Sequence, residues 1–110
     1  MTVKPTPPSP ARDKVRATVP KLIDLTEKVL FGDVWERPGL SKRDRSLITV
    51  ATLVALSRGE QLKGHLRRAL DNGVTKEEIV ELITHLAFYS GWPTAMTAAT
   101  IAKDILAEEG

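Results

Sequence analysis

The sequence predicts an all-α protein of about five helices, and three observations lead to this. Apolar residues recur at three- and four-residue steps over most of the chain. Helix start and stop signals divide it into segments of helical length. The alternation that marks a half-buried strand is found only in fragments around Val50. With 110 residues, 42% of them apolar, the chain has room for one compact domain.

The chain is expected to begin with a flexible tail over residues 1–17, followed by a helical domain over residues 18–110. Four prolines between Pro5 and Pro10 each fix φ and lack an N–H donor, which disfavours regular structure there. The first helix is predicted to begin near Pro20 and to run to about Leu30. The segment FGDVWERPGL after it is interpreted as an ordered loop held by its bulky side chains.

A central helix is predicted to start at Ser41, because Ser41 and Asp44 approximate a capping box. Apolar residues lie on nearly every side of this helix, which indicates burial over most of its circumference, and Gly59 is expected to end it. The third helix covers residues 60–72 and stops at Asn72-Gly73, a pair suited to a left-handed turn.

The last two helices have equally clear limits in the sequence. Thr75 and Glu78 form a capping box that opens the fourth helix, and Gly91 closes it. The apolar residues predicted to face inward from that helix are Ile79, Leu82, Ile83 and Leu86. The fifth helix begins near Pro93. Small residues that would let another helix approach closely line one side of it, namely Ala95, Ala98, Ala99 and Ala102.

Composition excludes several classes of function. The chain has no cysteine, so disulfides, thiolate metal sites, cysteine nucleophiles and dithiol redox chemistry are ruled out. Its two histidines are 20 residues apart and no phosphate-binding glycine loop or zinc motif is present, so no metal site is expected.

Charge and hydropathy bear on partners and location. The net charge is +2, and residues 1–17 carry +3 of it, so the other 93 residues carry −1 and nucleic-acid binding is disfavoured. The longest apolar stretch, Leu47–Leu56, has ten residues, about half of a membrane span. The N-terminus lacks the apolar stretch of a secretory signal, so no membrane association and a cytoplasmic location are expected.

The first candidate for chemistry is His65. It lies three residues after Leu62 and four before Ala69, so it projects from the apolar face and should be partly buried. Two interpretations stay open: a core histidine satisfied by one hydrogen bond, or a group that exchanges protons.

A second group of candidates lies on the fourth helix. Glu81, His85 and Tyr89 recur at four-residue steps and form a stripe of acid, imidazole and phenol. A carboxylate beside a histidine raises its pKa and fixes its orientation, and a phenol can donate to an oxyanion. The alternative is the polar flank of an amphipathic helix.

Three further residues are candidates for holding a substrate. Arg45 and Arg58, near the start and the end of the central helix, could each bind a carboxylate bidentately or could simply be surface residues. Trp92 follows the glycine that ends the fourth helix, and it is interpreted as a plug of the core or the wall of a pocket, the plug being favoured.

The segments VWERPGLSKRDRSLITVATLVAL and QLKGHLRRALDNGVTKEEIVELITHLAFYSGWPTAMTA closely resemble the carboxymuconolactone decarboxylase family, over roughly Leu30 to Leu106. The resemblance implies an AhpD-like helical fold that forms trimers or hexamers with active sites near subunit interfaces. It also implies a lyase of aromatic-compound catabolism that removes CO2 from a carboxylated lactone without a cofactor. The thiol-dependent peroxidases of the same superfamily need cysteines where this chain has Arg58 and Gln61, so that activity is excluded.

The resemblance implies the reaction, and we assign roles to the candidate residues from their chemistry. Arg45 and Arg58 would seat carboxylates of a small-molecule substrate, and His65 would return a proton as the general acid. His85 with Tyr89 would orient the substrate or stabilise an enolate. Glu81 and Trp92 would complete the substrate site. The competing hypothesis is a helical oligomeric module of the same fold that binds a small ligand without catalysis.

Overall fold

The computed structural model describes residues 9–108, in which helices are joined by turns and short loops, with no strand among these residues. The predicted all-α class is confirmed, with six α-helices in the described part rather than about five. The chain divides into two units, one up to Leu40 and the other from Ser41 onward. Within residues 9–108, every helix is too short or too polar to span a bilayer.

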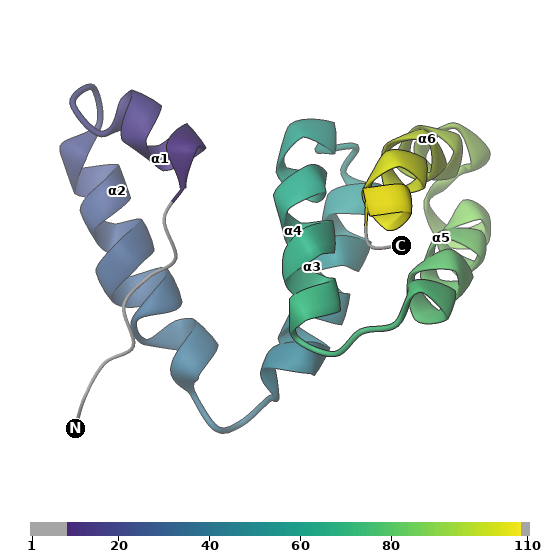
Figure 1. The fold of residues 1–110 in the computed structure, drawn as a ribbon, viewed down its shortest axis with the longest axis horizontal. Helices are drawn as coiled ribbons and strands as arrows, with labels where there is room; N and C mark the ends of the chain where they lie inside the picture. The colour runs from purple at the N-terminus through teal and green to yellow at the C-terminus, as the bar shows by residue number, and fades with distance from the viewer. Residues whose placement is uncertain (1–8, 109–110) are drawn as a thin grey trace. The chain divides into compact units, whose positions relative to one another are not determined.

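The first unit contains α1 (Pro10–Val15) and α2 (Pro20–Leu25), which Figure 1 labels. Helix α1 falls within the segment expected to be a flexible tail, and that expectation is wrong for these residues. The hydroxyl of Ser9 accepts a hydrogen bond from the backbone N–H of Arg12, and Pro10 stands in the first turn, where no N–H is needed. Residues 1–8 of the expected tail lie outside the described part.

Helix α2 continues as a π-helix, η1 (Thr26–Phe31), and a 3-10 turn, η2 (Val34–Glu36), follows. A side chain at Gly32 would place its Cβ 2.5 Å from the carbonyl oxygen of Lys28, so only glycine fits where η1 ends. The expected ordered loop is confirmed at Trp35, which is buried and lies 6.0 Å from the Phe31 ring between centroids.

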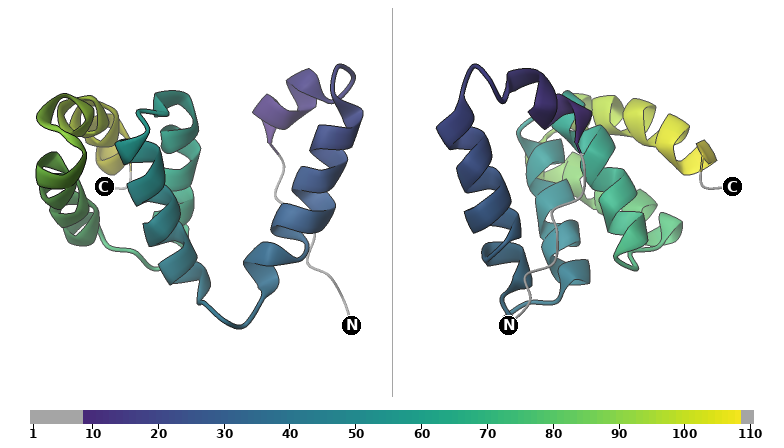
Figure 2. Two further views of the ribbon diagram at one scale, coloured as in Figure 1. Left: turned by 180° about the vertical axis from the view of Figure 1, so that it is seen from behind. Right: turned by 60° about the vertical axis from the view of Figure 1, so that its left-hand side comes forward.

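The second unit is built from α3 (Lys42–Ala55), α4 (Gly59–Asp71), α5 (Lys76–Ser90) and α6 (Trp92–Glu108). Helix α3 packs on α4 and α5, and α6 packs on α5 and α4, as Figures 1 and 2 show. The core lies where the four helices meet. Its most deeply buried side chains are Val50, Val54, Leu62, Leu66, Ala69 and Ile79.

The helix signals of this unit are largely confirmed. Thr75 and Glu78 form a reciprocal capping box at the start of α5. Ser41 accepts a hydrogen bond from the backbone N–H of Asp44, 3.0 Å away. Gly73 and Gly91 have φ values of 97° and 106°, the left-handed region that favours glycine, at the ends of α4 and α5.

The predicted end of the central helix is wrong. Helix α3 ends at Ala55, and Gly59 opens α4 instead of closing α3. The turn is made by Ser57, whose φ is 55°, with a hydrogen bond from the Arg58 N–H to the Leu53 carbonyl oxygen at 2.9 Å. A glycine search misses this stop because a serine occupies the left-handed position.

The predictions of which sides of α3 and α6 are buried also need correction. Only Ser46, Val50 and Val54 of α3 are buried, and Ile48 is 54% exposed, so burial of α3 is confined to one side in the single chain. On α6, Ala99 is exposed although three alanines of the predicted stripe are buried, because position 99 has turned away from the α5 side. The buried alanines are Ala95, Ala98 and Ala102.

Candidate active site

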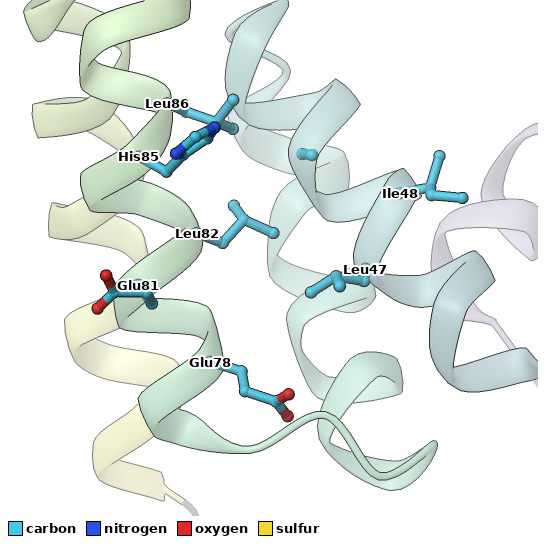
Figure 3. A pocket seen from close by; sticks show the side chains of 8 residues that line it. Leu47, Ile48, Glu78, Glu81, Leu82, His85 and Leu86 are labelled. Carbon is cyan, nitrogen blue, oxygen red and sulfur yellow. The ribbon is translucent and has the colours of Figure 1, made fainter.

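A pocket of about 510 Å³ lies between α3 and α5 in the second unit (Figure 3). Its walls are apolar and its polar groups all come from α5. The apolar residues are Leu47, Ile48, Ala51, Leu82 and Leu86, and the polar ones are Glu78, Glu81 and His85. In Figure 3, Leu82 and His85 extend from α5 toward α3, and Leu47 extends back toward α5.

Helical spacing explains why these side chains meet. On α3 the lining residues are four apart or adjacent, and on α5 they recur at three- and four-residue steps from Glu78 to Leu86, so each set shares one face. The capping box fixes where α5 begins. It therefore also fixes the register of every polar group in the pocket.

The Glu78 carboxylate joins the two walls of the pocket. Its Oε1 accepts a hydrogen bond from the backbone N–H of Thr75 at 2.9 Å, and its Oε2 accepts one from Nη2 of Arg43 on α3. The Thr75 N–H and then the Arg43 guanidinium lower the pKa of Glu78. Glu78 is therefore charged at neutral pH, and it holds the guanidinium of Arg43, which is not itself a lining residue, beside the pocket.

Sequence reasoning missed Arg43 as a site residue. It is 35 positions from Glu78 and no spacing rule connects the two. The sequence pattern explained Glu78 only as part of the capping box that begins the helix, not as a site residue. Only the way in which α3 packs beside α5 places Arg43 next to Glu78.

His85 and Tyr89, two of the predicted catalytic residues, are in contact. Their ring centroids are 4.7 Å apart and their planes differ by 25°, which is a stacked arrangement. His85 lines the pocket, whereas Tyr89 is 78% exposed and is not one of the lining residues.

Glu81 lines the pocket but is not paired with His85. Its carboxylate is directed away from α3 in Figure 3, and within residues 9–108 no hydrogen bond joins it to His85. The expectation that a carboxylate orients this imidazole is therefore wrong. The four-residue step makes Glu81 and His85 neighbours, but the ring of His85 stacks on Tyr89, one turn further along α5.

His65 lies on α4, outside the residues that line the pocket, and it is half-buried as predicted. Burial lowers the pKa of His65, and the positive charge of Arg68 lowers it further. An imidazole with a lowered pKa is mostly neutral at pH 7, so His65 is better suited to accept a proton than to donate one.

The remaining candidates also lie outside the pocket lining. Arg45 is half-buried on α3, and Arg58 is exposed at the start of α4. Trp92 is 58% exposed and packs edge-on against Phe88, with ring centroids 5.4 Å apart. The expectation of a core plug is wrong because Ala95 is the first residue of α6 to be buried, and Trp92 precedes it. Among the described residues, no cluster of three or more acidic or imidazole groups could hold a metal ion.

Known proteins resemble this chain along most of its length. Residues 20–104 match the model of the carboxymuconolactone decarboxylase family. The chain is 45% identical over 87 residues to 4-carboxymuconolactone decarboxylase of Acinetobacter baylyi, which covers 79% of this chain and 65% of that protein. It is 36% identical over 80 residues to nitrosuccinic acid decarboxylase npaB of Metarhizium robertsii, covering 73% of this chain and 56% of that protein.

A third relative is an uncharacterized 15.0 kDa protein of Paracoccus denitrificans, 35% identical over 102 residues, which covers 90% of this chain and 73% of that protein. The chain thus spans slightly less than two thirds of the length of the Acinetobacter relative. The family model covers more than half of the chain, and the resemblance seen in the sequence is confirmed. The chain belongs to the carboxymuconolactone decarboxylase family.

Proposed function

We propose that this protein is a cofactor-independent decarboxylase of a small carboxylic acid, such as a carboxylated lactone, and that the pocket between α3 and α5 is its active site. Two relatives are named as decarboxylases, which supports the reaction class. The observation that carries the assignment of the site is a pocket with apolar walls and a histidine at its edge.

The reaction needs two things from the protein. The bond between the carboxylate carbon and the adjacent ring carbon breaks, CO2 leaves, and the electron pair delocalises toward the lactone carbonyl. A proton then has to reach a carbon over which this negative charge is delocalised. Apolar walls favour the first step, because a carboxylate that has lost its water shell is less stable than the dispersed charge that replaces it.

His85 is the proton donor in this proposal. It lines the pocket, and histidine is the residue type that exchanges protons near neutral pH. The imidazolium gives its proton to the carbanion and is left as neutral imidazole, which solvent reprotonates because His85 is exposed. The sequence-based assignment to His65 is less well supported, because burial and Arg68 favour its neutral form.

A cation can seat the substrate through a carboxylate other than the one that leaves as CO2, and Arg43 joins the predicted Arg45 and Arg58 as a candidate. Glu78 holds Arg43 beside the pocket, and Nη1 of Arg43 also donates to the Asp44 carboxylate at 3.4 Å. The guanidinium has five N–H donors, so some are left with which to bind a substrate carboxylate. Glu78 remains anchored through its other oxygen by the Thr75 N–H.

The assignment of the pocket as the active site is tested by a substitution that fills the pocket with a larger side chain. CO2 release is measured across lactone acids and β-keto acids for the wild type, for Ala51→Phe and for Ala55→Phe. Ala51 lines the pocket, whereas Ala55 is exposed one turn further along α3 and is the matched control. We expect turnover to be lost only in Ala51→Phe. Ligand binding without CO2 release from any acid would favour the alternative, a binding module of the same fold.

The proposal includes assembly into a homo-oligomer, either a trimer or a hexamer, and a cytoplasmic location. Assembly is supported by large apolar side chains that a single chain leaves in water. The aliphatic and aromatic side chains of the second unit that are more than half exposed are Ile48, Leu56, Val80, Phe88, Tyr89, Trp92 and Met96.

A further inference from the structure

The proposed reaction does not use the stacked contact between His85 and Tyr89. The two rings lie one helical turn apart on α5, with centroids 4.7 Å apart and planes 25° from parallel. Only the imidazole belongs to the pocket lining. The phenol is 78% exposed and covers one face of the imidazole from outside the pocket.

This contact restricts the direction in which His85 can donate a proton. The N–H bonds of an imidazole lie in the plane of its ring, so the ring plane decides where they point. An exposed histidine on a helix would otherwise rotate between several orientations. The carboxylate of Glu81, the other candidate for orienting the ring, is directed away in Figure 3.

We infer that Tyr89 is a positioning residue, whose aromatic ring holds the imidazole of His85 with its edge toward the pocket, and that its hydroxyl takes no part in the reaction. The effect on turnover rests on the proposed function. The effect on the orientation of the His85 ring does not, because it follows from the contact alone.

Three variants separate the ring of Tyr89 from its hydroxyl. Tyr89→Leu removes the ring, Tyr89→Phe keeps it, and Phe88→Leu removes a neighbouring exposed aromatic ring that packs on Trp92 instead. We expect Tyr89→Leu to lower kcat roughly ten- to a hundredfold, with KM little changed, because the proton donor is misdirected. Tyr89→Phe and Phe88→Leu should both stay near the wild-type rate, measured per subunit of the assembled protein because Phe88 is also among the side chains that assembly is proposed to cover.

The second measurement is the NMR chemical shift of the His85 ring protons. The chain has two histidines, so His85→Gln assigns the signals. A parallel ring at 4.7 Å shifts these protons by its ring current, so Tyr89→Leu should move them and Tyr89→Phe should not. A merely structural role for Tyr89 would not produce this pattern together with a selective loss of kcat.

Two outcomes would overturn the inference. If Tyr89→Phe loses as much turnover as Tyr89→Leu, the hydroxyl acts on the substrate and positioning is not the role of Tyr89. If the His85 signals are unchanged in Tyr89→Leu, the rings are not stacked in solution. If the wild type releases no CO2 from any acid tested, the proposed function fails separately, and the His85 shifts still decide whether Tyr89 orients the ring.

Discussion

His65 makes the stability of the protein depend on pH, and the sign follows from its surroundings. Burial and Arg68 lower its pKa in the folded state, whereas the unfolded chain keeps the ordinary value of 6.5. As the pH falls below about 6.5, the unfolded state binds more protons than the folded state, so the free energy of unfolding decreases.

We therefore expect His65→Gln to lose less thermal stability than the wild type between pH 7 and pH 5. Melting curves at several pH values measure this, and His85→Gln, which changes an exposed histidine, is the control. The same acid sensitivity in His65→Gln and in the wild type would show that His65 titrates alike in the folded and unfolded states.

Ser57 offers a second prediction for a single residue. Its φ of 55° is strained for a side chain with a Cβ, by roughly 1 to 2 kcal/mol. Glycine relieves this strain but has more freedom to lose on folding, at about 0.5 to 1 kcal/mol. Ser57→Gly should therefore raise the free energy of unfolding by roughly 0.5 to 1 kcal/mol in urea titrations. A decrease would mean that the hydroxyl of Ser57 contributes more than the strain removes.

Among the elements, α5 depends most visibly on its N-terminal cap. Thr75→Ala removes the hydroxyl that accepts a hydrogen bond from the Glu78 N–H at 3.1 Å, and should cost about 1 kcal/mol. Thr84→Ala is the control, because the Thr84 hydroxyl only bonds back to the carbonyl oxygen of Val80 within the same helix. Urea titration of both variants measures the difference, and equal losses would contradict the role given to the cap.

The helix ends also show which features could be predicted from the sequence and which could not. Limits set by local chemistry, such as the Thr75 cap and the stop at Gly73, could be predicted because residues within one turn decide them. The stop at Ser57 could not, since packing between α3 and α4 imposes a conformation that serine does not prefer. The same holds for the candidate site. His85 was predicted from its spacing on α5, but Arg43 was not, because its contact with Glu78 depends on how two helices pair.

At the scale of the whole molecule, we predict that copies of the chain assemble into a homo-oligomer. The second unit leaves apolar side chains such as Phe88 and Trp92 in water, which oligomers cover and monomers seldom leave exposed. Sedimentation at micromolar concentration should give a trimer or hexamer of the 12.1 kDa chain. A single species of 12.1 kDa would refute the prediction.

The central claim is that the pocket between α3 and α5 is a decarboxylase site with His85 as its proton donor. The most direct test compares CO2 release per folded subunit in His85→Gln and His65→Gln, on an acid that the wild type turns over. We expect His85→Gln to lose about 10²- to 10⁴-fold in turnover, as a positioned proton donor does, and His65→Gln to retain most of its rate. A folded His85→Gln variant with the wild-type rate, beside an inactive and folded His65→Gln, would contradict the claim and assign the proton to α4.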